Sequence, residues 1–240
     1  MHTQSAHTHA RAQTYARVRG HTPIGRSSRW LRRRPQVLHE HMMAEVVGGT
    51  ISSRSDAVDY LTWTYFFRRL LVNPSFYHLE DASVEGINTY LSELVDGVLQ
   101  DLADARCIAL DDSLGTVAPQ TLGRVASYYY LKYTTVRLFS HSITEHNTVN
   151  QLLQVLCDAS EYDELPVRHN EDVMNGELAE KLPLPVDSRL LDSPHIKTHL
   201  LLQAHFSRVG LPISDYITDT KSVLDQSIRI LQAMVDVAGE

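Results

Sequence analysis

The sequence predicts a mainly α-helical fold, because apolar residues recur at helical spacing along most of the chain beyond residue 36. Serine and proline residues stand where these helices would begin, and glycine and proline residues stand where they would end. Only one short stretch has the pattern of β-strands. With 240 residues, of which 43% are hydrophobic, the chain can bury the core of one large domain or two small ones.

Three helices are expected first, at residues 37–47, 55–72 and 84–106. The second has an N-cap candidate in Ser53, three residues before Asp56. A β-hairpin should follow, because residues 107–110 and 116–118 flank a polar turn that contains a glycine. Three helices and a hairpin indicate a winged-helix module at residues 37–118.

Five further helices are expected, at residues 122–143, 148–159, 170–181, 194–209 and 218–238. Ser193 offers an N-cap for the fourth of these, and Pro194 suits its first turn. Since no strand pattern interrupts them, residues 119–240 are expected to form a helical bundle.

The last of these helices carries two opposed rows of side chains. One row is apolar and is expected to face a core; it consists of Leu224, Ile228, Leu231, Val235 and Ala238. The other row, about 200° away around the helix axis, consists of Ser222, Gln226, Arg229 and Ala233. Such a row of polar and small residues is either solvated or placed to guide a polyanion.

Two aromatic runs have competing interpretations. Tyr128, Tyr129, Tyr130 and Tyr133 either stack on bases, as in single-strand binders, or fill a bundle core. We favour the core, because the same helix carries Val136 and Phe139. The run of Trp63, Tyr65, Phe66 and Phe67 likewise predicts a helix that is buried on most sides.

A polar turn at residues 164–171 joins two of the predicted helices. Its hydrogen-bonding side chains form either a binding site or a buried network that ties the helices together. We favour the network. Asn170 is the expected N-cap of the helix that follows.

Charge is divided unevenly along the chain. Residues 1–36 hold 8 of the 22 Lys and Arg residues and no acidic residue, so the remainder has 14 basic and 29 acidic residues, a net charge of −15. Affinity for DNA or RNA comes largely from Lys and Arg, so contacts with nucleic acid should be local. Residues 1–36 are expected to be a disordered tail, either a targeting patch or an extension without function.

Several kinds of catalytic and metal site are missing from the sequence. It has no glycine-rich loop ending in Gly-Lys-Ser/Thr and no Asp-Glu-x-His box, so the chain alone is not expected to hydrolyse ATP. His195 and His199 have the i, i+4 spacing of metal ligands on a helix, but no third ligand is evident. A plain amphipathic helix is the better interpretation, and we expect no metal and no cofactor.

Two further features of the sequence indicate the cellular compartment. Cys107 and Cys157 are too few for a disulfide framework, which favours a reduced intracellular environment. No apolar run approaches the roughly 18 to 20 residues that span a bilayer, and no signal-peptide pattern opens the sequence. A soluble protein without a membrane partner is expected.

The chain contains five distinctive stretches, in the order "AEVVGGTISSRSDAVDYLTWTYFFRRLLVNPSFY", "TLGRVASYYYLKYTTVRLF", "ELPVRHNEDVMNGELA", "SPHIKTHLLLQAHFSR" and "TDTKSVLDQSIRILQAMVDVA". In order and spacing they resemble the region after the second motor domain of large superfamily 2 helicases, the Ski-like enzymes with a Sec-sixty-three homology domain. The resemblance covers residues 37–238, and residues 1–36 match nothing in it.

This resemblance implies a winged helix at residues 37–118 and a Sec-sixty-three-type helical bundle at residues 119–240. In the family these parts and the motor domains form a ring around one strand, and a long bundle helix lies across its path. Residues 218–238 would be that helix. Gln226 and Arg229 match its strand-facing polar positions, whereas Ser222 and Ala233 are added from spacing alone.

The implied role is the non-catalytic guiding and scaffold portion of an ATP-dependent 3′–5′ DNA/RNA helicase of the activating signal cointegrator complex type. Its family roles are DNA alkylation repair, ribosome quality control and transcription coactivation. The implied partners are single-stranded DNA or RNA, bound weakly, the helicase motor domains and subunits of that complex, in the nucleus and cytoplasm. Because the motor domains are missing and relatives continue beyond the long helix, the chain resembles a fragment.

Two other functions stay open. A protein-interaction scaffold without nucleic-acid binding would use the net charge of −15 to hold a basic partner. An independent winged-helix transcription factor is less well supported. Its recognition helix should be basic, whereas the charged residues within 84–106 are mostly acidic.

Overall fold

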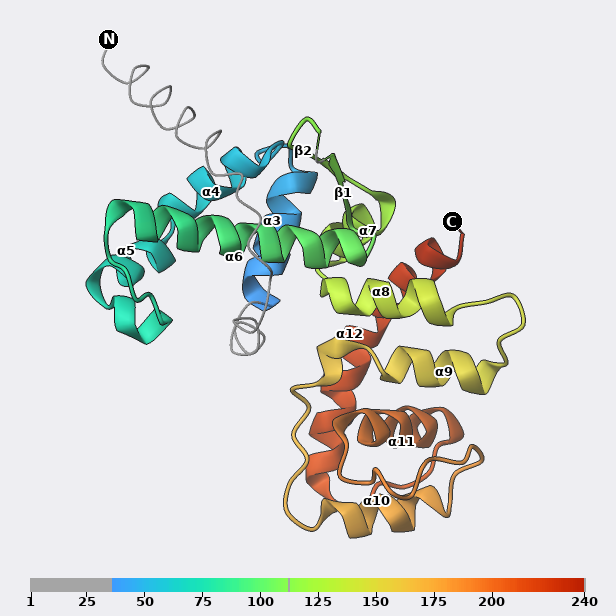
Figure 1. The fold of residues 1–240 in the computed structure, drawn as a ribbon. Coiled ribbons are helices and arrows are strands. Elements are labelled where there is room, and N and C mark those ends of the chain that lie inside the picture. Colours follow the sequence, from blue (N-terminus) through green and yellow to red (C-terminus); the bar gives the residue numbers. More distant parts are fainter. Residues whose placement is uncertain (1–35, 112, 240) are drawn as a thin grey trace. The chain divides into compact units, whose positions relative to one another are not determined.

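The computed structural model describes residues 36–111 and 113–239, which divide into two compact units (Figure 1). Residues 36–100 and 110–117 form the first unit, and residues 101–109 and 118–239 form the second. Over these residues the chain is mostly helical, and its single sheet has two strands. None of the helices in the described ranges combines the length and apolarity that crossing a membrane requires.

The first unit contains α3 (Gln36–Val47), α4 (Arg54–Thr62), α5 (Tyr65–Val72), the 3-10 helix η1 (Pro74–Tyr77) and the greater part of α6 (Val84–Asp104). Its core consists of apolar side chains that recur at helical spacing. Met42, Met43 and Val46 come from α3, and Leu91, Val95 and Val98 come from α6.

The predicted hairpin is present as β1 (Ile108–Asp111) and β2 (Thr116–Pro119). The segment before α4 adds to it, because Ser53 forms an antiparallel bridge with Thr116 and the Val117 amide donates to the Ser52 carbonyl at 2.9 Å. The Ser53 side chain also accepts from the Asp56 amide, which confirms Ser53 as the N-cap of α4.

The prediction of one continuous, buried helix at residues 55–72 was wrong. The helix stops at Thr62, and α5 starts anew with Thr64 as its N-cap, whose side chain accepts from the Phe67 amide. Trp63 is 88% exposed and Tyr65 is 73% exposed. The break turns these rings outward, so the density of aromatic residues here does not indicate burial.

The second unit contains α7 (Thr121–Tyr129), α8 (Tyr133–Ser142), α9 (Val149–Cys157), the 3-10 helix η2 (Ser160–Tyr162), α10 (Glu171–Ala179), α11 (Pro194–Ser207) and α12 (Ser214–Ala238). Ser193 caps α11, as expected. Every residue of α11 from Ile196 to Ala204 is buried, and the helix packs against α9, α10 and α12. It is therefore the centre of this unit's core.

The expected single helix at residues 122–143 is also interrupted. Tyr130 takes a left-handed conformation with φ of 52°, and α8 begins three residues later. The Leu131 amide closes the end of α7 by donating to the Ala126 carbonyl at 2.8 Å, and the Leu131 side chain is buried. Burial of Leu131 favours this turn although the sequence contains neither glycine nor proline here.

Helix α12 begins four residues earlier than predicted and runs through the whole second unit (Figure 1). It packs against α11, α9, α8 and α7 in turn. Because so many elements contact it, the orientation of its side chains is firmly set.

Candidate nucleic-acid interface

The face of α12 that turns to the core is not the one that the apolar row predicts. Ile228 is 66% exposed, Leu231 44% and Val235 70%, so the assignment of that row to the core was wrong. The buried face consists of Tyr216, Asp219, Thr220, Val223, Ser227, Ile230, Ala233, Met234 and Val237. This row is mixed, and burial of its polar members is possible because each has a hydrogen-bond partner; Ser227 and Tyr162, for example, pair through their hydroxyls at 2.9 Å.

The four residues of the predicted strand-facing row lie in different environments. Ser222 is exposed, whereas Gln226 and Arg229 are half-buried. Ala233 is fully buried in this chain. The structure thus brings Gln226 and Arg229 together at the surface and leaves Ala233 underneath.

Arg229 is held by the carboxyl end of α7. Its Nη1 donates to the carbonyls of Tyr129 and Tyr130 at 3.1 and 2.6 Å, and its Nη2 donates to Gln226 Oε1 at 3.2 Å. A cation beside the last carbonyls of a helix also interacts favourably with the helix dipole. Arg229 is therefore fixed in place before any ligand arrives.

Arg229 and Gln226 keep hydrogen-bond donors that could bind a ligand. A guanidinium has five N–H donors, and the Nη2 and Nε groups of Arg229 are not fully used by the three bonds described. The Gln226 carbonyl oxygen is engaged by Arg229, while its amide nitrogen has no partner among the described residues. Such donors suit phosphate or base oxygens.

The tyrosines at the end of α7 are not core residues, contrary to the favoured interpretation. Tyr128 is 76% exposed and Tyr130 is 87% exposed. Tyr129 is half-buried, and its hydroxyl donates to Asp236 Oδ2 at 2.8 Å, which raises the pKa of Tyr129. Tyr128 is exposed within α7 itself, and the helix break at Tyr130, which periodicity does not reveal, turns the Tyr130 ring to solvent.

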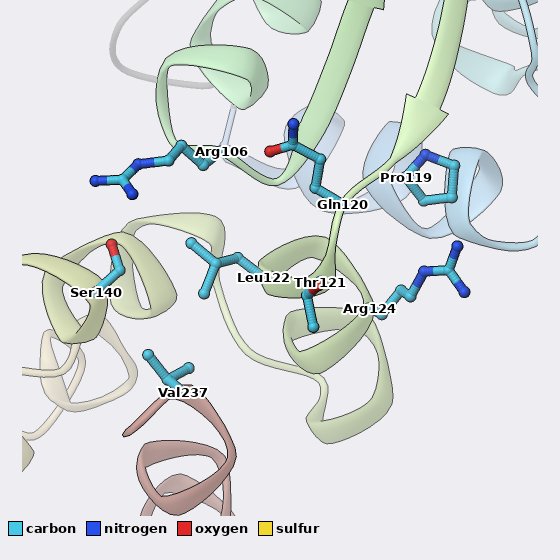
Figure 2. A pocket seen from close by; sticks show the side chains of 8 residues that line it. All are labelled: Arg106, Pro119, Gln120, Thr121, Leu122, Arg124, Ser140 and Val237. Carbon is cyan, nitrogen blue, oxygen red and sulfur yellow. The ribbon is translucent and has the colours of Figure 1, made fainter. Parts of the chain in front are cut away.

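A hollow of about 640 Å³ lies at the other end of α7 (Figure 2). Its lining includes Arg106, Arg124 and Gln120 together with Val237 of α12, and no lining residue is acidic. Figure 2 shows the two arginine side chains pointing away from each other. Within the described residues neither guanidinium pairs with an acceptor, so this end of α7 is a locally basic part of an acidic chain.

The polar turn at residues 164–171 belongs to a buried network, as favoured. Lys197, which is fully buried, donates through Nζ to Glu171 Oε2 at 2.6 Å and to Asp219 Oδ2 at 2.7 Å. Arg168 donates to the same two carboxylates at 2.9 and 2.8 Å. Asn170 stands at the predicted N-cap position, but its side chain makes no capping hydrogen bond.

Ionisation of this network is stabilised by its own hydrogen bonds. Burial by itself raises the pKa of Glu171 and of Asp219, but hydrogen bonds from Lys197 and Arg168 outweigh it and hold both pKa values below their usual range. The central position of Lys197 was missed from the sequence. A lysine amid the apolar residues of the 194–209 stretch was the available signal.

The histidine pair on α11 has separate partners. The His195 ring contacts the Cys157 carbonyl through Nδ1 at 2.8 Å and Asp163 through Nε2 at 3.0 Å. The His199 ring contacts Gln203 through Nδ1 at 2.9 Å, and burial lowers the pKa of His199. In the part of the chain that the structure describes, no three His, Cys, Asp or Glu side chains are grouped to hold a metal ion.

Two family models match the chain. The Winged Helix-turn-helix domain matches residues 34–112, and the Sec63 Brl domain matches residues 119–240. Together with the mainly helical structure, these matches confirm the predicted fold class, a winged helix followed by a Sec63-type bundle.

Similar proteins include two helicases and a subunit of a cointegrator complex. Over 203 residues, 85% of this chain, it is 54% identical to activating signal cointegrator 1 complex subunit 3 of Bos taurus. It is 54% identical over 84% of its length to the DExH-box ATP-dependent RNA helicase DExH14 of Arabidopsis thaliana, and 44% identical over 83% to the U5 small nuclear ribonucleoprotein 200 kDa helicase of Homo sapiens. The chain spans 9% of the length of each of these relatives.

Proposed function

Because this chain belongs to the Sec63 Brl family and also carries the winged helix of helicase relatives, we propose that it guides a single nucleic-acid strand without catalysing a reaction itself. In this proposal it is the non-motor cassette of an ATP-dependent 3′–5′ DNA/RNA helicase. Motor domains elsewhere in the helicase would hydrolyse ATP, and α12 would lie across the path of the strand.

The observation that carries this proposal is the pair Gln226 and Arg229 on α12. Both lie at the surface, both retain hydrogen-bond donors, and Arg229 is fixed by two carbonyls of α7. Donors that are already oriented lose little conformational entropy when they bind a ligand. Ser222, which is exposed one turn before Gln226, extends the same row.

Equilibrium binding of single-stranded DNA and RNA in moderate salt tests the proposal. Gln226→Ala removes a neutral hydrogen bond and should weaken binding by about two- to ten-fold. Arg229→Ala should weaken it at least as much, and circular dichroism would show whether the helical fold is retained. Gln232→Ala, at an exposed position of the same helix, is the matched control and should leave affinity unchanged. Unchanged affinity in both test variants would refute the assignment.

A protein-docking function is the second candidate, favoured by the exposed apolar row of α12. Ile217, Ile228 and Val235 are each more than 60% exposed at helical spacing, and contiguous exposed apolar side chains mark interaction surfaces. The net charge of −15 outside residues 1–36 suits a basic partner. Partners captured after nuclease treatment, and lost with the pair Ile228→Ser and Val235→Ser, would support docking over strand guiding.

The names of the similar proteins suggest partners and cellular processes for this chain. We propose the helicase motor domains and other subunits of an activating signal cointegrator complex as partners, since subunit 3 of that complex is among the similar proteins. DNA alkylation repair, ribosome quality control and transcription coactivation would be the processes served, in the nucleus and cytoplasm. Co-purification of the tagged full-length protein with those subunits tests this placement.

A further inference from the structure

Two tyrosine rings at the carboxyl end of α7 are exposed to an unusual degree. Tyr130 is 87% exposed and Tyr128 is 76% exposed. Neither hydroxyl hydrogen-bonds to another described residue. Aromatic side chains contribute most to stability when they are buried, so these two rings add little to the fold in their present positions.

The backbone beneath these rings is nevertheless held firmly. The Tyr130 carbonyl accepts from Arg229 Nη1 at 2.6 Å, and the adjacent Tyr129 is tied to Asp236 of α12 through its hydroxyl. The Tyr128 ring packs edge-on against the Tyr129 ring, with centroids 4.9 Å apart. The rings are thus presented to solvent from a fixed base, as a preformed binding surface requires.

The backbone that carries these rings is also in contact with hydrogen-bond donors. Arg229, which holds the Tyr130 carbonyl, also holds the Gln226 side chain, whose amide nitrogen has no partner among the described residues. Exposed aromatic side chains on a segment whose backbone contacts a cation, with an amide donor bound to that cation, match the chemistry of a nucleotide, which has an aromatic base and a charged phosphate.

We propose that Tyr128 and Tyr130 form a stacking platform for bases of a single strand whose backbone is contacted by Gln226 and Arg229. This inference rests on the proposed guiding function and names residues outside α12 that complete it. Stacking accepts any base, because every base has a π-face. A platform of this kind therefore suits a module past which a strand of any sequence must move.

The test combines loss of the ring with loss of the base. The full chain is titrated with oligodeoxythymidine, longer than the roughly 4–16 nucleotides that such sites cover, and with an abasic strand of equal length. The abasic strand keeps every phosphate, so any contribution from the basic residues 1–36 is common to both ligands. Tyr130→Ala removes the ring but keeps the carbonyl that Arg229 binds.

Tyr130→Ala should weaken binding of oligodeoxythymidine by about five-fold or more, with a similar loss for Tyr128→Ala. Tyr130→Phe should retain the wild-type affinity, because the ring is preserved. Tyr130→Ala should not change binding of the abasic strand. Tyr65→Ala, which removes a ring from α5 that is 73% exposed, is the matched control and should have no effect.

Two results would overturn the platform alone. If Tyr130→Ala and Tyr128→Ala bind oligodeoxythymidine as wild type does, while Gln226→Ala binds it more weakly, the platform fails and the guiding function stands. An equal loss for the ordinary and the abasic strand would also overturn it, since stacking needs a base. Absence of wild-type binding to either strand would instead refute the guiding function, and the platform with it.

Discussion

Lys197 joins three helices through one ammonium group. It lies on α11, and its Nζ donates to Glu171 of α10, to Asp219 of α12 and to the Pro166 carbonyl at 2.7 Å. Lys197→Met should lower the free energy of unfolding by about 3–5 kcal/mol, because it leaves two buried carboxylates with only Arg168 as a charged partner. Urea denaturation measures this. Lys221→Met, at an exposed position of α12, should change the free energy by less than about 0.5 kcal/mol.

The same network predicts how stability depends on pH. The folded-state pKa values of Glu171 and Asp219 lie below their usual range, so their stabilising effect is complete above the unfolded-state values near pH 4. It should be lost as pH falls through the lower folded-state values. Unfolding measured at about pH 6, 4 and 3 should show this decline, and the decline should be smaller in Lys197→Met. Equal pH dependence in both proteins would contradict this assignment.

At the scale of single elements, α7 starts in very close contact with the backbone before β1. A Cβ atom on Gly123 would lie 2.2 Å from the Cys107 carbonyl oxygen, whereas one on Gly97 of α6 would meet nothing within 4 Å. Gly123→Ala should therefore destabilise the protein, by about 1–3 kcal/mol for an overpacked site. Gly97→Ala should stabilise it by about 0.5–1 kcal/mol, because alanine restricts the unfolded chain. If the midpoint of thermal unfolding shifts in the same direction for both variants, the close approach of Gly123 to the Cys107 carbonyl is contradicted.

The two faces of α12 give a second test at this scale. Ile230 is fully buried and Ile228 is 66% exposed, although they are only two residues apart. Ile230→Ser should cost at least about 3 kcal/mol, whereas Ile228→Ser should cost less than about 0.5 kcal/mol. The sequence pattern predicts the reverse order, so chemical denaturation of the two variants decides between the faces.

Prediction from sequence succeeded where a local rule decides the outcome. Ser53 and Ser193 cap their helices as expected, and the hairpin forms where strand patterns flank a turn. Prediction failed where contacts with residues distant in sequence determine which side chains are buried. Asp219 and Ser227 are buried on α12 because Lys197 and Tyr162 supply hydrogen bonds from other elements, and helical periodicity does not contain that information.

The candidate interface was predictable only in part. Resemblance to the helicase family singles out Gln226 and Arg229, which do lie together at the surface. The exposed ring of Tyr130 depends on a left-handed conformation of that residue, although the sequence has neither glycine nor asparagine there. Loss of Tyr130 from the regular helix could not be predicted from spacing alone.

At the scale of the whole chain, the division of charge predicts a strong effect of salt on binding. Residues 1–36 carry eight basic and no acidic residues, while the rest has a net charge of −15. Removal of residues 1–35 should reduce the slope of log affinity for single-stranded DNA against log salt, by up to about 0.7 for each basic residue that contacted a phosphate. Equal slopes for the two proteins would show that the basic segment does not contact the strand.

The left-handed conformation of Tyr130 has a consequence for how this position can change. Glycine adopts a φ of 52° without the strain that a β-carbon causes, so the fold alone would be served better by glycine at residue 130. Tyrosine at this position lowers stability, and its ring is not part of the core. Selection for stability would therefore favour glycine at residue 130, whereas selection for the proposed stacking surface would favour tyrosine.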